Sequence, residues 1–129
     1  MFEYRGLKIS WLGHDGFRIK NSKTVYVDPY VTEAAEKADI LLITHEHFDH
    51  CSRGVINRIV SPETTIITTA LVKRQLSGTK VREIRSAKPG QKILVNDVSV
   101  ETVPAYNLNK FRSPGEPFHS KQEEMLGFI

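Results

Sequence analysis

Residues 40–50 of this chain read ILLITHEHFDH, an apolar run followed at once by a cluster of polar side chains. His45, His47, Asp49 and His50 place four potential metal ligands within six positions. Three imidazoles and a carboxylate suit a borderline divalent metal such as zinc. If the chain leaves the strand still extended, a period of two puts His45 and His47 on one side, and Asp49 and His50 reach the same pocket from the next turn. The run therefore predicts a metal centre at the end of a buried strand, with ligands for two neighbouring ions.

The composition is that of one compact domain. The chain has 129 residues, of which 40% are hydrophobic, so residues 1–129 are expected to form a single domain with its own core. No run of 18 apolar residues is present, which argues against a membrane span, and the amino terminus lacks the apolar core of a signal peptide. The one cysteine, Cys51, cannot form an internal disulfide, and this favours a reducing cytoplasm. Its thiol could bind zinc, but a small residue in the first turn of a helix is the favoured interpretation.

The charge is mildly basic, at +3, and part of it is concentrated. Between Lys73 and Lys92, seven positive residues meet a single acid, Glu83. Such a run could contact phosphates, but it is more often one solvated face of a protein. No aromatic residues are interleaved with these charges to stack on bases, so nucleic-acid binding is disfavoured.

Hydrophobic periodicity and turn residues predict an α/β fold with a mixed sheet. Three strands joined by tight turns form an antiparallel meander, and later strands alternate with helices before a final hairpin around Asn96-Asp97. The expected strands are residues 7–12, 17–20, 24–27, 40–44, 64–68, 81–84, 91–95, 98–103 and a segment beginning near 125. The expected helices are residues 32–38, 52–60 and 70–76, and residues 104–120 are expected to form a long loop.

The residues now support a family resemblance. Residues 45–50, after an apolar strand and before a predicted helix, resemble the metal-binding signature of the metallo-β-lactamase superfamily. Residues 11–17 resemble the strand-turn-strand opening of its small metal-dependent hydrolase branch. Residues 25–30 resemble that branch's second motif, in which Asp28 ends a strand beside the metal site, and residues 103–111 resemble a subgroup of the same branch.

The resemblance implies a sandwich of two mixed sheets with helices outside, built from two similar halves, of which this chain is similar to the N-terminal half. It implies that His45 and His47 bind a first metal and that Asp49 and His50 bind a second. Asp28 would lie behind the ligands and hold a ligand or loop in place. From the residues alone, a strand-ending Asp-Pro turn is an equal interpretation of Asp28.

Three other residues have weaker assignments. Asn107 stands where many relatives of this family have a histidine, the third ligand of the first metal, and an amide oxygen binds zinc poorly. His119 is the best substitute, although an isolated loop histidine is more often solvated, and Asn107 could instead cap a turn. The resemblance places His14 near the rim of the pocket, where it could equally hydrogen-bond to the backbone of its turn. The bridging aspartate and last histidine of the family's second half have no counterpart in this sequence.

The implied activity is metal-assisted hydrolysis of a small ester, lactone or phosphoester. The expected cofactor is zinc, up to two ions, with manganese or iron as alternatives, since histidine and carboxylate serve all three. Metal-activated water would attack the substrate, with Asp49 orienting it and taking up its proton. Two alternatives stay open: a metal-binding but inactive, truncated module, which the missing ligands favour, and a nuclease of the same superfamily. Whether this chain is an enzyme is therefore left undecided.

A half-fold also has consequences for partners. An incomplete sandwich exposes an apolar sheet face and strand edges, which are expected to be covered by a second copy in a homo-oligomer or by a missing C-terminal half. The other expected partner is a small-molecule substrate; nucleic acid is a disfavoured partner, and no membrane is expected.

Overall fold

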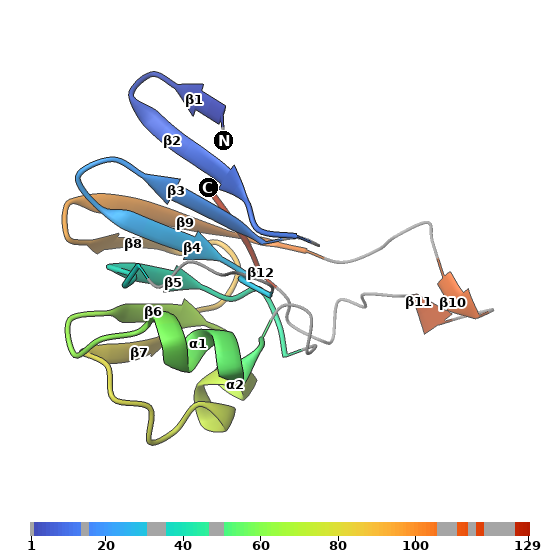
Figure 1. Ribbon diagram of the computed structural model, residues 1–129. Helices are drawn as coiled ribbons and strands as arrows, with labels where there is room; N and C mark the ends of the chain where they lie inside the picture. The colour runs from blue at the N-terminus through green and yellow to red at the C-terminus, as the bar shows by residue number, and fades with distance from the viewer. Residues whose placement is uncertain are drawn as a thin grey trace.

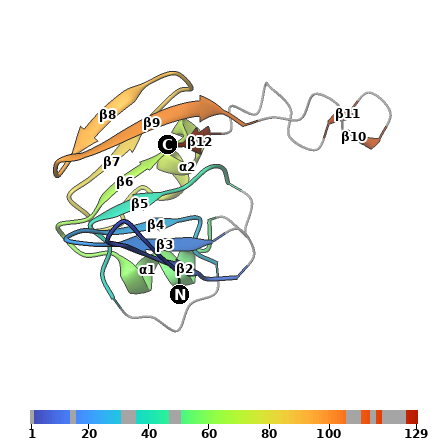
Figure 2. The same cartoon turned by 90° about the horizontal axis from the view of Figure 1, so that it is seen from above.

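The computed structural model describes residues 2–13, 16–30, 36–46, 51–105, 111–113, 116–117 and 126–129. A seven-stranded sheet carries a three-stranded sheet on one face, and Figure 2 shows β8 and β9 on one side of the larger sheet and α1 on the other. This arrangement is the mixed-sheet α/β class that the sequence predicts.

The seven-stranded sheet follows the order of the sequence, from β1 to β7 (Figure 1). Its first four strands pair antiparallel through short turns, and β4 to β7 pair in parallel. Parallel neighbours need a crossover connection, and the two helices lie in two of the three crossovers. The strands are β1 (Phe2–Tyr4), β2 (Leu7–Trp11), β3 (Phe17–Lys20), β4 (Thr24–Val27), β5 (Ile40–Leu42), β6 (Thr65–Thr68) and β7 (Glu83–Ser86), and the helices are α1 (Arg53–Ile59) and α2 (Ala70–Gln75).

The second sheet has the order β12-β9-β8 and is antiparallel throughout. Its strands are β8 (Lys92–Val95), β9 (Val98–Pro104) and β12 (Leu126–Phe128). Asn96 and Asp97 form the predicted two-residue hairpin loop, with φ values of 49° and 66°. Positive φ at both central residues is the requirement of a type I′ turn, which Asn and Asp tolerate.

The larger sheet has an apolar layer on each face. On one face, Tyr26, Leu41 and Ile66 pack with both helices. On the other face, Ile40, Leu42 and Ile67 pack with the second sheet. Alternate side chains of β4, β5 and β6 point into the two layers. Because both faces of β5 are covered, β5 is buried at every position.

Some element predictions were wrong, and each has a local reason. Residues 36–38, predicted as the end of a helix, are not helical; the Tyr26 hydroxyl donates to the Glu36 carbonyl at 2.9 Å and the Ala38 amide donates to Ile59 at 2.7 Å. The strand predicted at residues 81–84 begins at Glu83, and the predicted long loop contains two short paired strands, β10 (Phe111–Ser113) and β11 (Glu116–Pro117). β1 had no signal in the sequence patterns, and the turn that follows it, at Arg5 and Gly6, has positive φ at both residues.

Among the residues that the structure describes, no helix has the length and apolarity needed to cross a membrane.

Candidate metal centre

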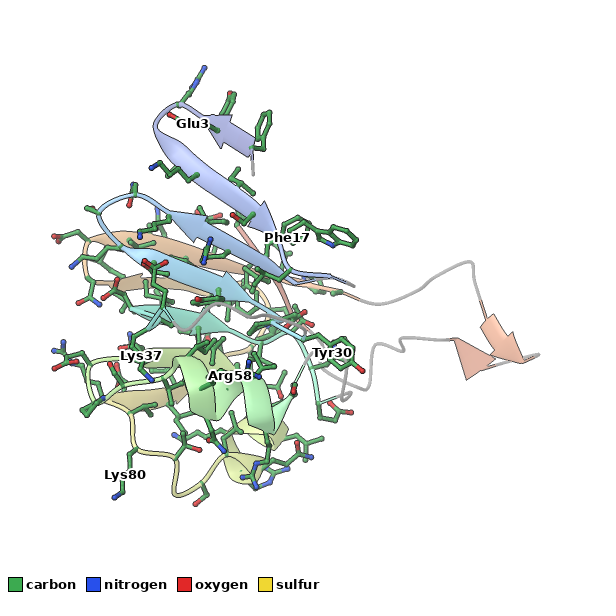
Figure 3. All side chains as sticks on the ribbon, viewed as in Figure 1. Glu3, Phe17, Tyr30, Lys37, Arg58 and Lys80 are labelled. Carbon is green, nitrogen blue, oxygen red and sulfur yellow. The ribbon has the colours of Figure 1, made fainter. Side chains whose placement is uncertain are left out.

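Two parallel strands bring the centre of the proposed site together. β4 and β5 run side by side in parallel, so the residues that follow them meet at one edge of the sheet, which Tyr30 marks in Figure 3. Asp28 follows β4 directly, and its backbone amide donates to the Leu42 carbonyl of β5 at 2.9 Å. His45 follows β5 by three residues. The hydrophobic pairing of the strands therefore fixes the distance between these two polar residues.

The Asp28 carboxylate accepts two hydrogen bonds from Thr44, the residue directly before the histidine cluster. Its Oδ1 accepts a hydrogen bond from the Thr44 amide at 2.8 Å, and its Oδ2 accepts one from the Thr44 hydroxyl at 2.7 Å. The side chain is 2% exposed, and its backbone has a left-handed φ of 43°. An aspartate tolerates this conformation better than most residues because its short polar side chain can bond locally. A buried carboxylate that binds one residue twice is a rigid clamp.

Thr44 also contacts the ring of His45. The Thr44 Oγ1 atom lies 2.7 Å from the His45 Nδ1 atom, within hydrogen-bond distance. His45 is 3% exposed, and its other ring nitrogen, Nε2, is also buried. The imidazole is therefore buried, and its Nδ1 atom contacts Thr44.

Thr44 also joins the two sheets. Its carbonyl oxygen accepts a hydrogen bond from the amide of Leu126, the first residue of β12, at 3.0 Å. Leu126 is fully buried and belongs to the apolar layer between the sheets. One residue thus contacts the clamp, the histidine and the second sheet.

Gly16 lies close to the backbone of Asp28 and Pro29. Gly16 closes the turn after β2, where its amide donates to Gly13 at 2.9 Å and its carbonyl accepts from Leu12 at 2.8 Å. A Cβ atom on Gly16 would lie 2.8 Å from the Asp28 carbonyl oxygen and 3.3 Å from the Pro29 Cα atom. Only glycine permits this approach without moving backbone.

Cys51 belongs to the core in the structure. Its side chain is 9% exposed and packs in the apolar layer under the helices. Burial raises the pKa of its thiol to about 11, against a smaller opposing effect of Arg53. α1 begins at Arg53, so Cys51 precedes the helix and does not lie in its first turn.

The structure places only part of the predicted site. Asp28 and His45 are described, whereas six predicted residues lie outside the described ranges: His14, His47, Asp49, His50, Asn107 and His119. Their roles stay predictions. Within the described ranges, no three His, Cys, Asp or Glu side chains gather as a metal site. Sequence reasoning missed Thr44, for which the available signal was a hydroxyl residue directly before His45 at the end of a buried strand.

The basic run between Lys73 and Lys92 is spread over several elements. Lys73 and Arg74 lie on α2, whereas Arg85 lies on β7, 3.7 Å from Glu83, and Lys92 lies on β8, 3.8 Å from Glu101. Arg85 and Lys92 thus each have an acidic neighbour, and the neighbour of Lys92, Glu101, lies outside the run.

The residues present fit a divalent metal. A buried imidazole held through Nδ1 has Nε2 as the nitrogen that a metal would bind, and ligating histidines commonly have their other nitrogen engaged in this way. The sequence adds two histidines and a carboxylate within the next five positions, a nitrogen and oxygen set that zinc, manganese and iron all accept.

Comparison with known proteins gives a consistent answer. Residues 8–125 match the model of the beta-lactamase superfamily domain. A UPF0173 metal-dependent hydrolase of Koribacter versatilis is 33% identical over 115 residues, which cover 80% of this chain and 48% of that protein. The chain spans about half the length of the curated relatives it matches.

Two solved structures extend the comparison. The crystal structure of a Parabacteroides distasonis protein, assigned as a metal-dependent hydrolase, superposes with a TM-score of 0.75 at 30% identity, covering 95% of this chain and 55% of that one. A diiron β-hydroxylase of Streptomyces venezuelae superposes with a TM-score of 0.60 at 17% identity, covering 79% of this chain and 24% of that one. This second likeness shows a common fold alone.

Proposed function

The chain belongs to the metallo-β-lactamase superfamily, in the branch of small metal-dependent hydrolases, and on that premise we propose that it takes part in hydrolysis of a small ester, lactone or phosphoester. The observation that supports this most is the chain of contacts from Asp28 through Thr44 to His45, because it holds a buried imidazole at the edge where two strands end.

The metal-binding residues of this proposal are His45, His47, Asp49 and His50. A divalent metal held there would supply Lewis acidity, which would lower the pKa of bound water from 15.7 to about 7. Asp28 and Thr44 keep the His45 ring in one orientation, so little free energy is spent on ordering that ligand. Asp49 orients the attacking water and accepts its proton. In this proposal His119 would complete the nitrogen set in place of Asn107, and His14 would have its role at the rim, as the family resemblance implies.

Zinc is the proposed metal, since imidazole and carboxylate ligands suit it and it needs no redox partner. Up to two ions are proposed. The single cysteine supports a cytoplasmic location for the proposed enzyme.

Metal content tests the site. Protein purified after growth with zinc is dialysed and its metal is measured by mass spectrometry, for the wild type and for His47→Ala and Asp49→Asn. Asp97→Asn is the matched control for Asp49→Asn, because it makes the same chemical change at an exposed hairpin turn. Loss of metal in His47→Ala and Asp49→Asn, with retention in Asp97→Asn, is the expected result. Metal that survives both substitutions would eliminate the site.

Hydrolysis is tested on the same proteins with nitrophenyl esters, a lactone and bis-nitrophenyl phosphate. Turnover that needs metal and disappears in Asp49→Asn is expected. Metal binding without turnover on any of the three would instead support the inactive metal-binding module. Salt-sensitive binding of single-stranded DNA would support the nuclease.

A partner is proposed for the apolar end of the larger sheet. The register places Phe2, Tyr4, Trp11 and Phe17 on one face, the same face on which β4 and β5 pack with the second sheet. They are 61%, 51%, 69% and 40% exposed, respectively. Figure 3 shows Phe17 at this end of the sheet, away from the helix side that Arg58 marks.

These four aromatic side chains, termed here the aromatic face, expose on the order of 450 Å². The largest apolar patch of a typical monomer is roughly 300–600 Å², often a functional surface, and about 800 Å² per partner forms a standard interface. A neighbouring cavity of about 230 Å³, lined by Leu7, Ile19 and Val98 among others, extends the aromatic face toward Ile129, which is 74% exposed. We propose that a second copy of this chain covers it through the same face, in a symmetric dimer.

A further inference from the structure

We infer that Thr44 is a positioning residue that selects the tautomer of His45, so that Nδ1 carries the proton and the Nε2 lone pair faces the metal site. Thr44 is half-buried between the two side chains that it joins, 2.7 Å from an oxygen of one and 2.7 Å from a nitrogen of the other.

The direction of the two hydrogen bonds follows from counting protons. A hydroxyl has one proton to donate, and a carboxylate can only accept. Asp28 Oδ1 already accepts from the Thr44 amide, and Oδ2 accepts the hydroxyl proton. The hydroxyl therefore has no second proton for the ring, and the contact at 2.7 Å requires His45 Nδ1 to donate.

The tautomer decides which ring nitrogen can bind a metal. A neutral imidazole has one N–H and one lone pair, so a proton on Nδ1 leaves the lone pair on Nε2. Nε2 is buried at the strand edge where the histidine cluster begins. The carboxylate of Asp28 thus reaches the proposed metal through two hydrogen bonds, with Thr44 between them.

The tautomer itself does not depend on metal binding, whereas its effect on affinity rests on the proposed function. Loss of a partner that orients a ligating histidine typically weakens metal binding roughly 10- to 100-fold. The two parts are therefore measured separately.

The test uses three variants of the full chain. Thr44→Ser keeps the hydroxyl, and Thr44→Val keeps the side-chain shape but removes the hydroxyl. Asp28→Asn reverses the direction of the two hydrogen bonds that join residue 28, Thr44 and His45, termed here the relay. In Asp28→Asn the amide oxygen still accepts from the Thr44 amide, so the NH2 group faces the hydroxyl. The hydroxyl must then accept from Asn and donate to Nδ1, which moves the ring proton to Nε2. Backbone amide spectra check that each variant is folded.

The first measurement is the 15N chemical shifts of the His45 ring in metal-free protein, at a pH where the imidazole is neutral. The expected result is an Nδ1–H tautomer in the wild type and in Thr44→Ser, a mixture in Thr44→Val, and an Nε2–H tautomer in Asp28→Asn. An Nε2–H tautomer in the wild type, or one tautomer in all four proteins, would overturn the inference whether or not the chain is an enzyme.

The second measurement is zinc affinity by competition with a chelating dye. Affinity should fall roughly 10- to 100-fold in Thr44→Val and Asp28→Asn and be restored in Thr44→Ser. Equal affinity in Thr44→Val and the wild type would remove Thr44 from the metal site. Absence of zinc binding in the wild type, with the expected tautomers, would refute the proposed function and leave the tautomer assignment standing.

Discussion

At the scale of the residue, Asp28 combines two unusual features: a left-handed backbone and a buried carboxylate. The chain contains a matched counterpart in Asp97, which also has positive φ but is exposed. Replacing either by alanine places a Cβ-bearing residue without a local bond in the left-handed region, so that part of the cost is shared. The difference between the two variants then reports the bonds from Asp28 to Thr44.

We expect Asp28→Ala to lower the free energy of unfolding by about 1–3 kcal/mol more than Asp97→Ala. The reason is that the Thr44 amide and hydroxyl lose their acceptors in a partly buried site. Urea unfolding followed by circular dichroism measures both. Equal losses would show that the clamp contributes nothing beyond its backbone conformation.

A second residue gives the fold a pH dependence. Tyr26 is fully buried, and burial raises the pKa of its phenol from the ordinary 10.0, although Arg18 opposes this. The folded state therefore favours the neutral phenol. Its stabilising contribution is complete below pH 10 and is lost as the pH rises through the higher folded pKa. Absorbance at 295 nm should show one of the four tyrosines ionising at a higher pH than the others in folded protein, and all four ionising near pH 10 in urea. Four tyrosines that ionise at the same pH in folded protein would contradict the prediction.

At the scale of the element, the turn after β2 lies close to the backbone of the two residues that follow β4. Gly16→Ala is expected to destabilise the protein by about 1–3 kcal/mol, because its Cβ atom would meet the Asp28 carbonyl at 2.8 Å and force backbone to shift. Gly54→Ala is the matched control: nothing lies within 4 Å of that Cβ atom, and alanine favours α1 by about 0.5 kcal/mol. Thermal unfolding should move in opposite directions for the two variants.

The elements also show what local patterns can predict. β5 was predictable because a continuous apolar run describes a strand buried on both faces, and β6 because residues 64–68 are β-branched throughout. The helix expected through Ala38 was not confirmed in residues 36–38, because a bond from the distant Tyr26 hydroxyl and one to Ile59 hold that segment. The histidine cluster could be recognised from spacing, but the relay through Thr44 depends on the parallel pairing of β4 and β5, which no local pattern contains.

At the scale of the whole molecule, the aromatic face makes self-association testable. The wild type is expected to dimerise at micromolar concentration, and Trp11→Lys is expected to yield monomers, because a charge would be buried without a partner. Leu94→Lys is the control: Leu94 is 70% exposed but alternates with Ile93 and Val95 of the apolar layer, so it points away from that layer. Light scattering that shows a monomeric wild type would refute the dimer.

The hydrogen bond from Leu126 to Thr44 has one further consequence, a reciprocal one. Thr44 holds the ring of His45 and at the same time the first residue of β12. An ion that favours the ordered ring therefore favours the docked strand, and whatever docks the strand must favour the ion by the same free energy. The Leu126 amide proton should exchange with solvent more slowly when metal is bound. β12 would then report on the occupancy of a metal centre to which Thr44 connects it.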